Sequence, residues 1–177
     1  MRNLLVSFSL GLGVALGLAT ASTAQMPAYT EPGPLPPALA SAKTIFVSNA
    51  GADSGLFPEP FSGDPDRAYT EFYAALKATG DYTLAGDPSQ ADLVLELRLL
   101  APEGPSEPSK QKGASDPLPS FRLVVYDAKT HYILWTVTNS IDLAFLQKTH
   151  DKNFDVALAG VLNQFLHVSG KPPVPAH

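Results

Sequence analysis

The chain has 177 residues, a formal net charge of −5 and no cysteine. The acidic balance disfavours nucleic-acid binding, because the phosphate backbone selects basic proteins. The lack of cysteine excludes disulfides, thiol catalysis, iron–sulfur clusters and acylation of a lipobox cysteine, so the fold must be stabilised by apolar burial.

Residues 1–24 have the three-part layout of a cleavable secretory signal peptide. Arg2 supplies the positive start, residues 4–19 form an apolar run, and small residues precede Gln25. The run is shorter than the roughly 20 residues that a transmembrane helix needs. We therefore predict cleavage after Ala24, a periplasmic or secreted location, and no transmembrane anchor after cleavage; the alternative is an uncleaved anchor.

The first half of the mature chain begins with prolines and continues with a strand and a helix. Residues 25–42 are rich in proline and predict an extended leader. Residues 43–49 predict the first strand, and residues 50–64 a turn-rich connection. A helix is expected over 65–79, since Asp64 suits the N-cap, an apolar stripe follows at helical spacing, and Gly80 ends it.

The second half reads as strands followed by a helix. Residues 81–85 and 93–100 predict two strands, the latter with leucine at every second position. The polar, proline-rich residues 101–119 predict a mobile loop, as a tolerated insertion or as a segment that orders on a partner. Residues 121–126 and 132–138 predict a hairpin, 153–168 a helix, and 170–177 a proline-rich tail.

This order, β-α-β-β-β-β-α, predicts one α+β domain over residues 43–169. The economical arrangement is a two-layer sandwich, with a mostly antiparallel sheet and two helices packed on one face. A hairpin between the second and third strands is one way of joining them.

Three short motifs carry a resemblance to known proteins. They are Ala-Asp before a strand at residues 91–96, Asp-Ala-Lys-Thr in the turn at 127–130, and Leu-Trp at 134–135. In element order, residues 43–168 are similar to the amino-terminal domain of TolB-like and CsgG-like periplasmic proteins. Residues 48–57 also resemble uncharacterised exported proteins of acidobacterial type. The resemblance implies a fold and an envelope location, without site residues.

The sequence shows no catalytic or metal-binding pattern. The four histidines have no ligand spacing, so we predict no metal site, no cofactor and no catalytic residue. Ser54 stands in an Asp-Ser-Gly turn and lacks the Gly-x-Ser-x-Gly elbow of hydrolases. A small secreted serine hydrolase using Ser54 is an alternative that requires a histidine within hydrogen-bond reach.

The connection over residues 50–64 is the predicted binding region. It carries Leu56, Phe57 and Phe61, which either cover the core or present a contact patch. Our hypothesis assigns binding to Asp53, Ser54, Phe57 and Phe61 in an exported, non-enzymatic accessory domain of the cell envelope, whose partner is an envelope protein or component. A further alternative is a structural subunit that assembles through an edge strand.

Overall fold

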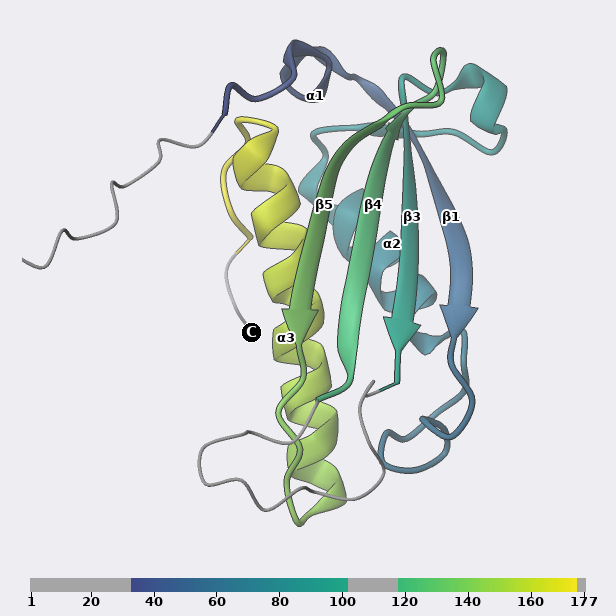
Figure 1. Ribbon diagram of the computed structural model, residues 1–177, viewed down its shortest axis with the longest axis vertical. Helices are drawn as coiled ribbons and strands as arrows, with labels where there is room; N and C mark the ends of the chain where they lie inside the picture. Colours follow the sequence, from purple (N-terminus) through teal and green to yellow (C-terminus); the bar gives the residue numbers. More distant parts are fainter. Residues whose placement is uncertain (1–32, 102–117, 175–177) are drawn as a thin grey trace, which may run out of the picture. The chain divides into compact units, whose positions relative to one another are not determined.

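The computed structural model describes residues 33–101 and 118–174 (Figure 1). The predicted signal peptide, the start of the leader, most of the loop 101–119 and the last residues of the tail lie outside the described residues. In chain order the elements are α1 (Pro37–Ser41), β1 (Thr44–Ala52), α2 (Arg67–Thr79), β2 (Thr83–Leu84), the 3-10 turn η1 (Pro88–Gln90), β3 (Leu93–Leu100), β4 (Ser120–Asp127), β5 (Ile133–Ser140) and α3 (Gln147–Val168).

The five strands form one mixed sheet in the order β2-β1-β3-β4-β5. β1 is parallel to both of its neighbours, β2 and β3. The pairs β3–β4 and β4–β5 are antiparallel. Parallel neighbours need a crossover, which α2 provides between β1 and β3. The α+β class is confirmed. The prediction of a hairpin between the second and third strands is wrong, because β2 and β3 lie on opposite sides of β1.

The core lies between the sheet and the helices α2 and α3, which both lie behind the sheet in Figure 1. The leucines of β3 supply one layer: Leu93, Leu95 and Leu99 have no exposed surface. Phe154 and Phe165 of α3 are also fully buried. The leucine alternation predicted from residues 93–100 therefore corresponds to the helix-covered face.

α2 begins slightly later than predicted, at Arg67. The prediction that Asp64 caps the helix is wrong, because Asp66 is the N-cap residue and no side chain caps it. The carboxylate of Asp64 accepts the N–H of Asp66 at 2.9 Å in the turn before the helix. Asp66 instead accepts a hydrogen bond from the side chain of Asn49 at 2.7 Å. Gly80 ends the helix with φ of 71°, which a residue without Cβ adopts freely.

The sequence analysis predicted an extended leader over residues 25–42. The structure differs at residues 37–41, which form α1. Pro37 occupies the first helical position, where its missing N–H removes no helical hydrogen bond. Leu39 is fully buried and joins the main core. This single apolar anchor explains why a short helix forms in a proline-rich segment.

α3 begins at Gln147, before the predicted residue 153. Its first two turns are polar, so they carry no apolar periodicity for sequence analysis to detect. In the described part of the chain, no helix has the length and apolar character needed to cross a membrane.

Candidate functional site

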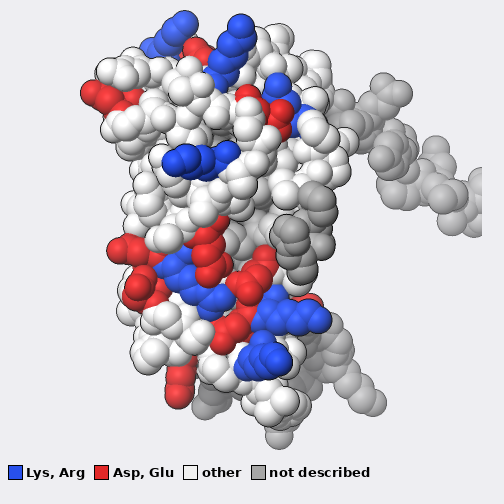
Figure 2. All heavy atoms as spheres, turned by 180° about the vertical axis from the view of Figure 1, so that it is seen from behind, with Lys and Arg blue, Asp and Glu red and all other residues white. Residues whose placement is uncertain are grey.

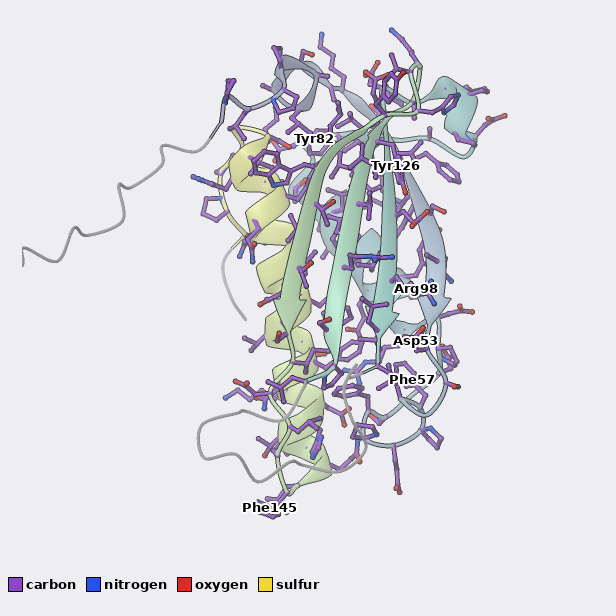
Figure 3. All side chains as sticks on the ribbon, in the orientation of Figure 1. Asp53, Phe57, Tyr82, Arg98, Tyr126 and Phe145 are labelled. Carbon is purple, nitrogen blue, oxygen red and sulfur yellow. The ribbon has the colours of Figure 1, made fainter. Side chains whose placement is uncertain are left out.

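Asp53 joins the ends of β1 and β3 (Figure 3). One carboxylate oxygen accepts a hydrogen bond from Arg98 at 2.8 Å, and the other accepts the N–H of Ala101 at 3.0 Å. The Arg98 hydrogen bond, followed by that of Ala101, lowers the pKa of Asp53 below its ordinary value. These contacts use both oxygens, which gives Asp53 a structural role at this end of the sheet.

The aromatic residues of the predicted binding region point inward. Phe61 has no exposed surface, and its ring centroid lies 5.2 Å from that of Phe154. Phe57 is half-buried, with centroid distances of 6.2 Å to both of these rings. The contact role predicted for Phe61 is wrong, because a side chain without exposed surface has nothing to present to a partner. The interpretation that the loop covers the core fits both residues.

Ser54 is exposed, and no hydrogen bond joins it to a histidine among the described residues. His131 lies in the β4–β5 turn, whereas His150 and His167 lie on α3. His150 is engaged with the backbone of Ala144. The nucleophile–base pair that the hydrolase alternative requires is therefore not assembled within residues 33–101 and 118–174. That part also contains no group of His, Asp or Glu side chains arranged to hold a metal.

An ion-pair cluster around Arg67 joins α2 to α3. The guanidinium contacts Glu71, Asp151 and Asp155 at 2.8, 2.8 and 2.6 Å. It also lies 4.3 Å from the ring centroid of Phe154. Figure 2 shows acidic and basic side chains intermixed on this side of the molecule. The sequence analysis did not predict this cluster, since Arg67 is 84 residues from Asp151.

Asp151 is the most strongly held carboxylate of the cluster. Burial by itself raises its pKa, but hydrogen bonds from the Ser62 N–H, Arg67 and Gln147 outweigh that cost and lower the pKa to about 2. The Ser62 and Arg67 donors lie 2.9 and 2.8 Å from the same oxygen. Asp151 therefore connects the 50–64 loop, α2 and α3.

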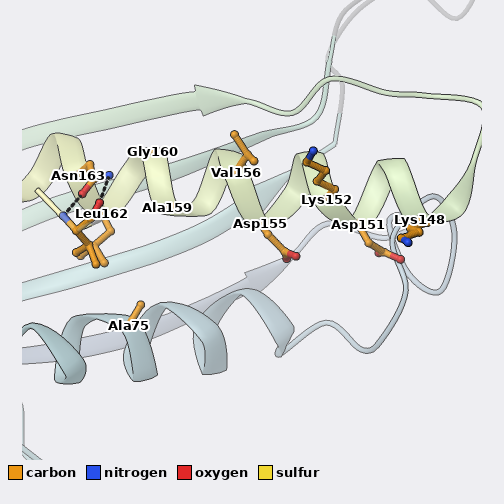
Figure 4. A pocket seen from close by; sticks show the side chains of 11 residues that line it. Ala75, Lys148, Asp151, Lys152, Asp155, Val156, Ala159, Gly160, Leu162 and Asn163 are labelled. Atoms are coloured by element: carbon orange, nitrogen blue, oxygen red, sulfur yellow. Dashed lines mark hydrogen bonds between the residues drawn. The ribbon is translucent and has the colours of Figure 1, made fainter. Parts of the chain in front are cut away.

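A hollow of about 700 Å³ runs along the outward side of α3 (Figure 4). Apolar residues line most of it, and charged residues stand at one end: Ala75, Val156, Ala159 and Leu162, then Lys148, Asp151, Lys152 and Asp155. Both aspartates bind Arg67, whereas neither lysine forms an ion pair with a described residue. The charge left without a partner at this end is therefore positive.

β5 is an edge strand, with β4 on one side and no strand on the other within the described part of the chain. Its eight residues, Ile-Leu-Trp-Thr-Val-Thr-Asn-Ser, include neither a charge nor a proline. Natural proteins commonly protect an edge strand with charged residues or proline, because the unpaired backbone groups of an edge can pair with strands from other chains. β5 is thus a long edge without that protection.

The hydrogen-bonding register shows which groups of β5 are available. The N–H of Ile141 donates to the carbonyl of Pro119 at 2.8 Å, immediately beyond the Ser120–Ser140 pair. Hydrogen-bonded and non-hydrogen-bonded pairs alternate along an antiparallel ladder. The backbone groups of Thr136, Thr138 and Ser140 therefore point away from β4.

A groove of about 360 Å³ lies beside this edge, between β5 and the last turns of α3. It is lined by Trp135, Asn163, Gln164, His167 and Val168. The indole and the valine give it an apolar wall, and the other three side chains add hydrogen-bonding groups. The unpaired edge of β5 and this groove together form the candidate site, which the sequence-based hypothesis did not include.

No family model matches the chain, and no curated protein matches it either. Solved structures of similar fold include a DUF4136 family protein from Bacteroides thetaiotaomicron, at 16% identity, with 76% of this chain and 92% of that chain covered and a TM-score of 0.48. A DUF330 protein from Xanthomonas campestris is 15% identical, with coverages of 73% and 85% and a TM-score of 0.41. The LpoB C-terminal domain from Salmonella enterica is 14% identical, with coverages of 57% and 83% and a TM-score of 0.36.

The resemblance to TolB-like, CsgG-like and acidobacterial-type proteins stays a prediction, because neither a family model nor a curated protein matches the chain.

Proposed function

We propose that this protein is an exported accessory domain of the cell envelope, which acts by binding a segment of another protein along the β5 edge. The open, uncharged edge beside a groove is the observation that carries the proposal. The signal-peptide pattern of residues 1–24 supports export.

The chemistry of the site suits an extended segment. Backbone groups at Thr136, Thr138 and Ser140 provide donors and acceptors at every second residue, which is the spacing of another strand. In this recognition mode, main-chain hydrogen bonds supply affinity and pockets for alternate side chains supply specificity. The groove beside Trp135 and Val168 would receive one such side chain.

The backbone test uses Thr138→Pro, which removes an N–H that points away from β4, and Thr138→Ala, which keeps it. A photo-crosslinker at Thr136 of the full chain identifies the partner, which is then purified. Binding of the partner should slow amide exchange in β5. The affinity for the partner should fall about tenfold or more in Thr138→Pro and change little in Thr138→Ala. Equal affinities for the two variants would contradict the proposal.

The predicted loop surface at Asp53, Ser54 and Phe57 remains a separate proposal, because Ser54 is exposed and Phe57 is half-buried. Phe57→Ala distinguishes the two surfaces in the same assay. If Phe57→Ala abolishes binding while Thr138→Pro binds normally, the loop rather than the β5 edge contacts the partner.

The same edge supports a second candidate function, a structural subunit that pairs with another copy of itself. The absence of charge on β5 favours it, because two copies of an uncharged strand meet without repulsion. Sedimentation equilibrium of the exported protein should then show an oligomer that dissociates in Thr138→Pro. A monomer at all accessible concentrations would eliminate this candidate.

A further inference from the structure

The connection between β5 and α3 places apolar side chains on the surface at one end of the domain. Phe145 is 107% exposed, Leu146 69% and Leu143 45%. Figure 3 shows Phe145 projecting beyond the start of α3. Three neighbouring apolar side chains that project outward form a contiguous exposed patch, and patches of this kind mark contact sites. We refer to residues 143–146 as the apolar tip.

The backbone of the tip is held by side chains of α3. Asn153 donates to the carbonyl of Asp142 at 2.7 Å, and the Nε2 atom of His150 contacts the backbone of Ala144. Gln147 donates to the carbonyl of Pro60 at 2.8 Å, which fixes the start of the helix. These contacts hold the backbone on both sides of Phe145, while the apolar side chains remain outside. Presenting them costs little further ordering entropy when a partner binds.

The charges next to the tip are cationic. Lys148 and Lys152 follow it on the first turns of α3, both exposed and neither paired with a described residue. Asp151 lies between them, but it is bound to Arg67. Asp142 is exposed and is the acidic residue of the connection itself. Apolar side chains next to two available ammonium groups match the boundary between acyl chains and anionic phosphates.

We propose that the apolar tip docks reversibly on an anionic lipid surface, with Phe145 and Leu146 inserted at the level of the headgroups and Lys148 and Lys152 beside the phosphates. A lipid surface accommodates protruding side chains without a complementary pocket, which distinguishes it from a protein partner. This inference uses no residue of the β5 edge.

The first test measures partition of the exported full-length protein onto sedimented vesicles of phosphatidylethanolamine and phosphatidylglycerol, with vesicles of pure phosphatidylcholine for comparison. Phe145→Ala should lower the partition coefficient about tenfold, as expected for loss of a buried aromatic ring. Lys148→Ala and Lys152→Ala should each lower it about fivefold at low salt and less at high salt. Thr138→Pro should partition like the unmodified protein, so failure here and failure of the β5 proposal are distinguishable.

The second test locates the tip in the bilayer. In a Trp135→Phe background with a melting temperature near that of the unmodified protein, Phe145→Trp places a single fluorophore on the tip. Tyr132→Trp places one on another exposed site, in the β4–β5 turn, where Tyr132 is 75% exposed. Brominated lipids should quench Trp fluorescence in the first variant and leave the second unchanged.

Three results would each overturn the lipid proposal. They are no partition onto either vesicle type, partition that Phe145→Ala leaves unchanged, and equal quenching of both fluorophores. Tip-dependent binding to a purified envelope protein, without partition onto vesicles, would overturn it in favour of a protein contact.

Discussion

Replacing Asp151 by Asn tests how strongly the cluster around Arg67 stabilises the fold. The carboxylate accepts hydrogen bonds from Arg67 and the Ser62 N–H, and its pKa falls from 3.8 to about 2. At about 1.4 kcal/mol per pKa unit, that difference corresponds to about 2–3 kcal/mol of folding free energy. The side chain is 22% exposed, so screening by solvent brings the expected value down to about 2 kcal/mol.

The sign follows from the direction of the change. A carboxylate with a lowered pKa stabilises the fold fully above its unfolded value of 3.8 and loses that contribution as the pH falls through about 2. Asp151→Asn should therefore lower the free energy of unfolding by about 2 kcal/mol at neutral pH. The gap between the two proteins should close as the pH falls from about 5 towards 2. Urea unfolding followed by far-ultraviolet circular dichroism measures both quantities.

Asp155→Asn is the matched control, because Asp155 binds the same guanidinium but is 57% exposed. Its loss should be below about 1 kcal/mol at neutral pH, as for other exposed ion pairs. A gap between Asp151→Asn and the unmodified protein that stays constant down to pH 2 would refute the reasoning. Equal losses in the two variants would refute the ranking of the two carboxylates.

Three further substitutions test the packing by urea unfolding. Gly160→Ala should raise the free energy of unfolding by about 1 kcal/mol, through helix propensity, only in an Asn139→Ala background. In the unmodified protein the new Cβ would lie 2.4 Å from the Asn139 amide nitrogen. An equal effect in both backgrounds would contradict that contact. Phe61→Ala should cost about 3–5 kcal/mol as a core truncation, and a loss below 1 kcal/mol would show that the loop does not cover the core. Asp92→Ala should cost about 1–2 kcal/mol by leaving the N–H groups of residues 43 and 44 without their acceptor, whereas Asp87→Ala, at an exposed turn, should cost less.

The elements with local signals were predictable from sequence. Leucines at every second position of residues 93–100 predicted β3 and its buried face, because strand side chains alternate between faces. The stripe after Asp64 and the stop at Gly80 similarly predicted α2. These features depend on neighbours in the chain, so sequence patterns contain them.

Features that depend on distant partners were missed. The prediction of a hairpin between the second and third strands failed because β1 separates them, a choice made by the whole sheet. The edge position of β5 depends on that same strand order. The pairing of Arg67 with Asp151 has no local pattern, since the two residues lie 84 positions apart. The candidate site therefore required the three-dimensional arrangement, although the strand that forms it was predicted.

The pairing of β1 also bears on the order in which the chain can fold. β1 has its neighbours in β2 and β3, which come only after the connection and the whole of α2. On the proposed export route, a chain that emerges amino terminus first would expose Ile45, Phe46 and Val47 without a partner until β3 has emerged. The unpaired strand would be most vulnerable to aggregation in that interval.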